Sequence, residues 1–191
     1  MICILLVIVG VGIVKLRQPA QKSQDNPSSL SYPTSQIVTF KVEGQTEQIT
    51  LQAVESDSGR LVLHIDTSRY EALPKDEMLV ITPITQMSDV RPVRMTVTYE
   101  NEQAMAVIKK HTEQATVHFD TITPIQNVSF NQYEGLEVIA TDRDTKLTDH
   151  IIVIPHKDHG SYRITMELTA HTSEGHGTRL LQMAKTITIV K

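Results

Sequence analysis

The chain has 191 residues, of which 40% are hydrophobic, 21% charged and 4% aromatic, and it contains one cysteine. This composition is typical of a globular protein with one large or two small domains. A single cysteine excludes an intrachain disulfide and multi-cysteine metal sites. The 18 basic and 22 acidic side chains give a net charge of −4, which offers no basic field to a polyanion, so we expect no nucleic-acid partner.

The first segment of the chain is apolar. Residues 2–14 carry no charge and are followed directly by Lys15 and Arg17. A helix of this length spans about 20 Å, whereas the hydrocarbon core of a bilayer is about 30 Å thick. A secretory signal is the alternative, but no basic residue precedes the run and no small-x-small cleavage site follows it. We predict that residues 1–17 form a transmembrane anchor or an uncleaved signal whose natural start lies upstream of Met1.

Residues 18–36 are rich in proline, serine and glutamine. Such a segment cannot bury a core, and we predict a disordered stalk. The basic residues after the apolar run favour the cytoplasmic side for the rest of the chain. A stalk before an all-β body favours the opposite side by architectural analogy. We expect a single-pass protein of the inner or plasma membrane with an extracytoplasmic, periplasmic body.

From Ile37 onward, apolar residues recur with a period of two, which is typical of half-buried strands. Turn residues such as Glu43-Gly44 separate about ten such runs, and the pattern predicts an all-β fold, an antiparallel sandwich. Residues 100–110 fit either element, because Ala104, Val107 and Ile108 have helical spacing. We predict a strand there, since the segment leads into the alternating residues 115–119.

One local motif resembles a known superfold. Asp158-His159-Gly160-Ser161-Tyr162, followed by alternating apolar residues, resembles the D-x-G-x-Y entry into the penultimate strand of immunoglobulin-like sandwiches. The resemblance implies a tyrosine corner at Tyr162. It also implies a hairpin that turns through residues 174–177 and returns as a strand over Thr178–Val190. It covers roughly the last 70 residues and implies no activity.

A short internal repeat indicates two domains. Ile81-Thr82-Pro83-Ile84 recurs as Ile122-Thr123-Pro124-Ile125. If the repeat reflects duplication, the chain holds one β-sandwich domain over residues 37–120 and an immunoglobulin-like one over 121–191. The alternative is convergent strand chemistry within one larger sandwich over residues 37–191.

Histidine is the residue type that most indicates a function. Five histidines fall within the 27 residues from His150 to His176, and the predicted hairpin brings several of them to one end of the sandwich. Neutral imidazole binds copper or zinc, and the thioethers of Met166 and Met183 suit Cu(I). The alternative is that they are loop histidines facing water and core methionines. The predicted metal site comprises His156, His159, His171 and His176.

No catalytic motif of the common hydrolase, zinc-protease or P-loop type occurs in the sequence. The first functional hypothesis is therefore a non-catalytic module for protein interaction or envelope assembly, with a protein partner. The second is a copper- or zinc-binding protein of the cell envelope. An enzyme is the third, and it would require a pocket with perturbed titratable groups.

Overall fold

The structure is a computed structural model that describes residues 32–56, 60–75, 78–85, 93–157 and 160–190. The predicted membrane segment, most of the predicted stalk, Asp158 and His159 lie outside these residues. No helix within the described ranges is long and apolar enough to cross a bilayer. The described residues belong to one compact unit.

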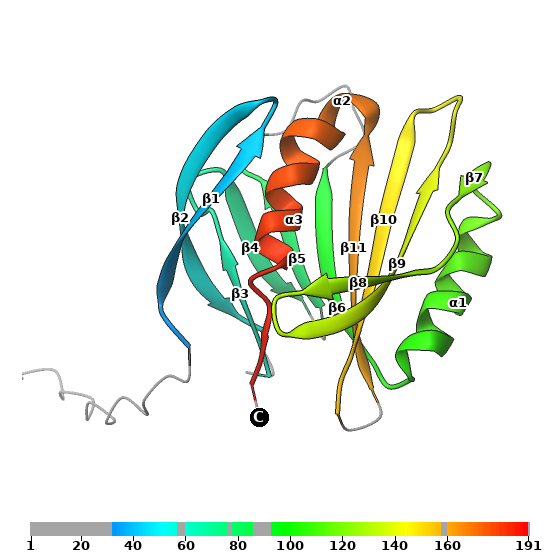
Figure 1. The fold of residues 1–191 in the computed structure, drawn as a ribbon, viewed down its shortest axis with the longest axis horizontal. Helices are drawn as coiled ribbons and strands as arrows, with labels where there is room; N and C mark the ends of the chain where they lie inside the picture. The colour runs from blue at the N-terminus through cyan, green and yellow to red at the C-terminus, as the bar shows by residue number, and fades with distance from the viewer. Residues whose placement is uncertain (1–31, 57–59, 76–77, 86–92, 158–159, 191) are drawn as a thin grey trace, which may run out of the picture. The chain divides into compact units, whose positions relative to one another are not determined.

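A small antiparallel sheet contains four strands (Figure 1). The turn between its first two strands is formed by Glu43 and Gly44, whose φ angles of 51° and 78° suit a two-residue hairpin of right-handed twist. The predicted turn is therefore confirmed. In spatial order the strands are β1 (Ser35–Val42), β2 (Gln45–Glu55), β3 (Leu61–Ile65) and β12 (Thr188–Ile189).

The end of the predicted stalk belongs to this sheet. β1 begins at Ser35, and the carbonyl oxygen of Pro33 accepts a hydrogen bond from the ring of buried His64 at 2.8 Å. The hydroxyl of Tyr32 also bonds the carboxylate of Glu55. The predicted boundary at residue 36 is therefore wrong by a few residues, because polar composition hides these contacts with distant strands.

The second sheet contains eight strands. Its first seven run in the order β4 (Tyr70–Lys75), β5 (Met78–Pro83), β6 (Arg94–Glu100), β11 (Ser161–Thr169), β10 (Leu147–Pro155), β9 (Tyr133–Thr141) and β7 (Thr121–Ile122), and β8 (Gln126–Phe130) also pairs with β9. The antiparallel two-sheet class predicted from the sequence is confirmed.

The division into two sandwiches at residue 120 does not occur. β6 pairs with β11 over seven residue positions, from Arg94–Glu167 to Glu100–Ser161. Strands from both sides of the predicted boundary are therefore joined in one sheet through β6 and β11, as the alternative of a single larger body requires. The repeated Ile-Thr-Pro-Ile sequence lies at the end of β5 and around β7, which are different places in that sheet.

The strand predicted over residues 100–110 is instead the start of helix α1 (Ala104–Ala115). Its buried side chains, Val107 and Ile108 among them, pack on Val138, Ile151 and Val153 of β9 and β10. The apolar residues of this segment have helical spacing, and a helix places them as a continuous stripe on the sheet. Residues Ile151–Ile154 of β10 are consequently buried on both faces.

The predicted return strand over Thr178–Val190 is also corrected. Three short helical elements follow β11: α2 (Ala170–Thr172), the π-helix η1 (Ser173–Gly177) and α3 (Thr178–Ala184). Leu180, Met183, Ala184 and Ile187 are buried at helical spacing. They join the main core, which also takes side chains from both sheets. Only the last residues of the segment form a strand, β12.

We predict that Ile108→Ala lowers the free energy of unfolding by about 2–5 kcal/mol, because it leaves a cavity between α1 and β10. Chemical denaturation monitored by circular dichroism measures the loss. Lys109→Ala, at an exposed position on the same helix, should change it by less than about 0.5 kcal/mol. Equal effects of the two substitutions would contradict the packing described here.

Candidate functional site

The structure separates the predicted histidines. His156 follows β10, beside the start of β11, and its backbone N–H bonds the carbonyl of Gly160 at 2.8 Å. His171 and His176 lie beyond the other end of β11. A strand of nine residues is roughly 30 Å long at about 3.4 Å per residue. His156 therefore cannot share a metal ion with His171 or His176, and His159 lies outside the described residues.

The same separation extends to other candidate ligands. Within the described ranges, no three side chains of histidine, cysteine, aspartate or glutamate are grouped to hold a metal ion. Met166 and Met183 are both fully buried in the core. The convergence predicted from the sequence depended on a hairpin turn at residues 174–177, where the chain instead continues as a helix.

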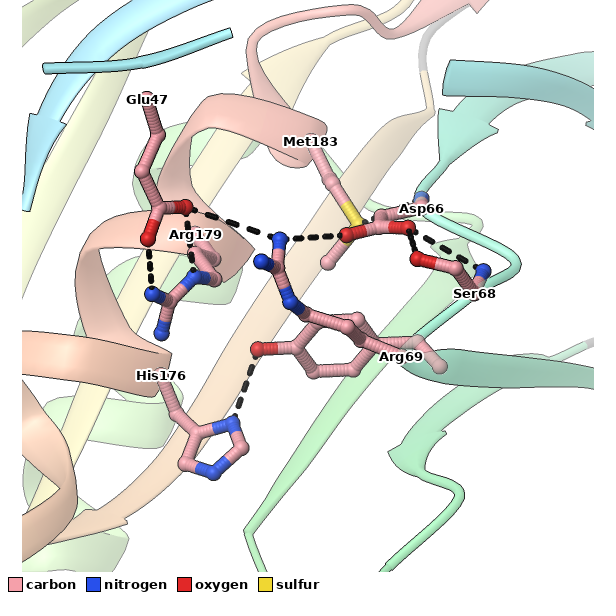
Figure 2. A network of polar contacts seen from close by, with 8 residues as sticks. Glu47, Asp66, Ser68, Arg69, His176, Arg179 and Met183 are labelled. Atoms are coloured by element: carbon pink, nitrogen blue, oxygen red, sulfur yellow. Dashed lines mark hydrogen bonds and ion pairs between the residues drawn. The ribbon is translucent and has the colours of Figure 1, made fainter. Parts of the chain in front are cut away.

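His176 belongs to a polar cluster beneath η1 and α3 (Figure 2). Its Nδ1 atom lies 2.8 Å from the hydroxyl of Tyr70, and the two rings meet edge to face. Burial and the nearby Arg179 guanidinium lower the pKa of His176. Burial raises the pKa of Tyr70 far above its usual value. Both groups are consequently neutral at pH 7, and a single hydrogen bond joins the tyrosine hydroxyl and the imidazole.

Arg179 of α3 forms a forked ion pair with Glu47 of β2 (Figure 2). Its Nη2 and Nε atoms lie 2.5 and 3.1 Å from the two carboxylate oxygens. The pair lowers the pKa of Glu47 and raises that of Arg179. The side chains are only 18% and 23% exposed, so water screens the interaction weakly.

Asp66, in the turn after β3, completes the cluster. One of its carboxylate oxygens accepts from the backbone N–H and the hydroxyl of Ser68, at 3.1 and 2.5 Å. The other lies 3.0 Å from Arg69, which also approaches Glu47 at 3.5 Å. Two carboxylates thus face two guanidinium groups, and each has a partner within the cluster. This arrangement holds α3 on the small sheet and presents no free nucleophile.

A pocket of about 430 Å³ lies at the N-terminal end of α1, and we call it the α1 pocket. It contains one of the predicted site residues, His156, whose Nδ1 atom is buried and has no partner among the described residues. Most of its exposed wall is apolar. Its lining residues include Ala104 and Met105 of α1, Leu136 of β9, and His156 and Lys157 after β10.

Gly160 shows why the motif around Tyr162 has its glycine. A Cβ atom at this position would lie 2.2 Å from the hydroxyl oxygen of Tyr99. The rings of Tyr99, Tyr162 and His156 pack edge to face, with centroids 5.4 to 6.1 Å apart. The glycine therefore lets an aromatic cluster form beside the α1 pocket. The immunoglobulin-like likeness itself stays a prediction.

Sequence reasoning missed a second pocket, of about 420 Å³, which we call the His64 pocket. His64 lies between Leu63 and Ile65, and period two predicts that it faces water. All five residues of β3 are buried instead, because Pro33 and α3 cover the other face of the strand. The contacts that bury it come from residues far along the chain, and no local pattern indicates them.

Comparison with known proteins shows the fold alone. The solution structure of cyanobacterial PsbP (CyanoP) from Synechocystis sp. PCC 6803 aligns with 73% of this chain and 92% of that one, at a TM-score of 0.50 and 10% identity. A crystal structure from Bacteroides thetaiotaomicron VPI-5482 aligns with 73% of this chain at a TM-score of 0.48 and 10% identity, and the match spans only 48% of that protein. No protein-family model and no curated protein matches. The described residues thus define an antiparallel two-sheet protein that shares its fold with cyanobacterial PsbP.

We predict that stability falls as the pH drops from 7 towards 5, in part because of His176. Its pKa is lowered in the folded state, so the unfolded chain binds more protons as the pH falls through the unfolded value of about 6.5. The contribution is present above that value and is lost below it. Burial lowers the pKa of His111 too, which adds to the same slope.

His176→Gln tests this assignment, because the amide oxygen can accept from Tyr70 but does not titrate. The dependence of unfolding free energy on pH should become shallower, as measured by urea denaturation between pH 5 and 7. His171→Gln is the matched control, since His171 is exposed on α2. An unchanged slope in His176→Gln would show that this histidine is not responsible.

Proposed function

We propose that this protein is a non-catalytic binding module that the N-terminal apolar segment holds at a membrane, with its body on the extracytoplasmic side. Its partner is a protein, which it engages at the α1 pocket. One observation carries the proposal: this pocket is open and mainly apolar, and the side chain of Met105 in its wall is 45% exposed. Exposed apolar surface within a concave site favours binding.

The occupant that fits the pocket is an apolar side chain on an extended segment of the partner. Methionine is flexible and polarisable, so Met105 can adapt its shape to such a side chain. Gln103, Asn127 and Lys157 also line the pocket and offer polar atoms for the main chain of the same segment. An apolar centre with polar groups beside it is typical of protein interfaces.

The polar cluster supports a binding role over a catalytic one. Tyr70 and His176 bond one another, and the carboxylates of Glu47 and Asp66 are occupied by arginines. A general base or nucleophile needs a free lone pair and access to substrate. These groups instead serve to hold α3.

Site-specific photo-cross-linking in living cells tests the proposed surface. A benzophenone amino acid replaces Asn127 in the pocket wall of the full chain, and the adduct is identified and its partner purified. We expect Met105→Glu to reduce the adduct, and the affinity of the purified pair, on the order of tenfold or more, because an apolar side chain of the partner would desolvate the carboxylate on binding.

The matched control is Glu113→Gln, an exposed position on α1 outside the pocket wall. It should leave both the adduct and the affinity unchanged. Loss of binding in both variants, or adducts formed equally well from position 113, would contradict the α1 pocket as the binding surface.

Membrane attachment through the N-terminal apolar segment is tested in the same cells. Deletion of residues 1–31 should move the protein from the membrane fraction to the soluble fraction.

A further inference from the structure

The His64 pocket is lined mainly by polar side chains. It lies where the small sheet meets the end of α3, and no carboxylate occurs among its lining residues within the described part of the chain. Lys185 is the one residue of formal charge among them. The lining comprises Pro33, Gln36, Val38, His64, Asn131, Gln182, Lys185, Thr186 and Thr188. Three amide side chains, two hydroxyls and an ammonium therefore surround a space large enough for a small molecule.

His64 supplies an acceptor that lacks a partner. Its side chain is almost entirely buried, with 2% of the residue exposed. The Nε2 atom lies 2.8 Å from the carbonyl oxygen of Pro33, which can only accept, so Nε2 carries the proton. In the neutral ring Nδ1 is then an acceptor, and it has no hydrogen-bond partner among the described residues. A buried acceptor without a donor costs free energy that a ligand hydroxyl would recover.

The backbone around His64 is fixed, so the ring is held in place. Its N–H donates to the hydroxyl of Thr186 at 2.8 Å, and that hydroxyl lies 2.7 Å from the carbonyl oxygen of Met183. Less than 1 Å² of the Nδ1 atom is exposed. The long side chains of Gln36, Gln182 and Lys185 in the wall would have to move for a ligand to reach this atom. The site thus combines a buried acceptor with a lining that carries one positive charge.

From these observations we infer that the His64 pocket binds a small hydroxylated carboxylate of the sugar-acid class. A hydroxyl of the ligand donates to Nδ1 of His64, and the amides and the hydroxyl of Thr188 bond the remaining oxygens. The carboxylate pairs with Lys185, since no acidic side chain in the wall competes for that ammonium group. This site involves none of the residues of the α1 pocket, so it stands independently of the proposed protein partner.

Nuclear magnetic resonance of the full chain in detergent micelles, with labelled histidine, tests the inference. Glucuronate is the probe, glucose tests the hydroxyls alone and acetate tests the carboxylate alone. We expect glucuronate to shift the Nδ1 resonance of His64 in a saturable way, at concentrations at which glucose and acetate do not. Equal shifts from acetate would overturn the role of the hydroxyl groups, and equal shifts from glucose would overturn that of the charge.

Lys185→Gln should weaken glucuronate binding on the order of tenfold, because it removes one charge-assisted hydrogen bond. Lys185 is exposed, so the variant should fold, and its melting temperature verifies this. Lys109→Gln on α1 removes an equal charge elsewhere on the surface and should leave the affinity unchanged. No saturable shift with glucuronate, or equal weakening in the two variants, would overturn the inference.

Discussion

The docking of α3 on the small sheet is the interaction on which the rest of the structure depends. Arg179 and Glu47 are separated by 132 residues in the chain, yet they form a forked, weakly screened ion pair. Beside it, Leu180 and Met183 of the helix enter the main core. The apolar contacts supply most of the stabilisation, whereas the ion pair and the surrounding cluster determine where along the sheet the helix lies.

The position of α3 determines which side chains line the His64 pocket. His176 of η1 and Arg179 of α3 anchor this part of the chain through Tyr70 and Glu47. The other side of α3 carries Gln182 and Lys185 to the wall of the His64 pocket. The α1 pocket belongs to a different part of the body, at the end of β10. The two pockets can therefore serve two different ligands, one apolar and one polar.

Alternation of apolar and polar residues predicted most of the strands and the antiparallel class, because most strands bury one face and expose the other. It did not predict α3, since Leu180, Met183 and Ile187 are spaced for a helix within a segment whose last residues alternate. The candidate site was hardest to predict. His156 was singled out and does line a pocket, but the bond between Tyr70 and His176 joins residues 106 positions apart. Residues so far apart in the chain come together only in the folded protein, so no local sequence pattern predicts their contact.

A double-mutant cycle on Glu47 and Arg179 measures how strongly this pair positions α3. Glu47→Gln, Arg179→Met and the double variant are compared by urea denaturation at neutral pH. If this pair holds α3 in place, the two substitutions should be non-additive, with a coupling energy of about 1–3 kcal/mol. Additivity within about 0.5 kcal/mol would show instead that the helix is positioned without this interaction.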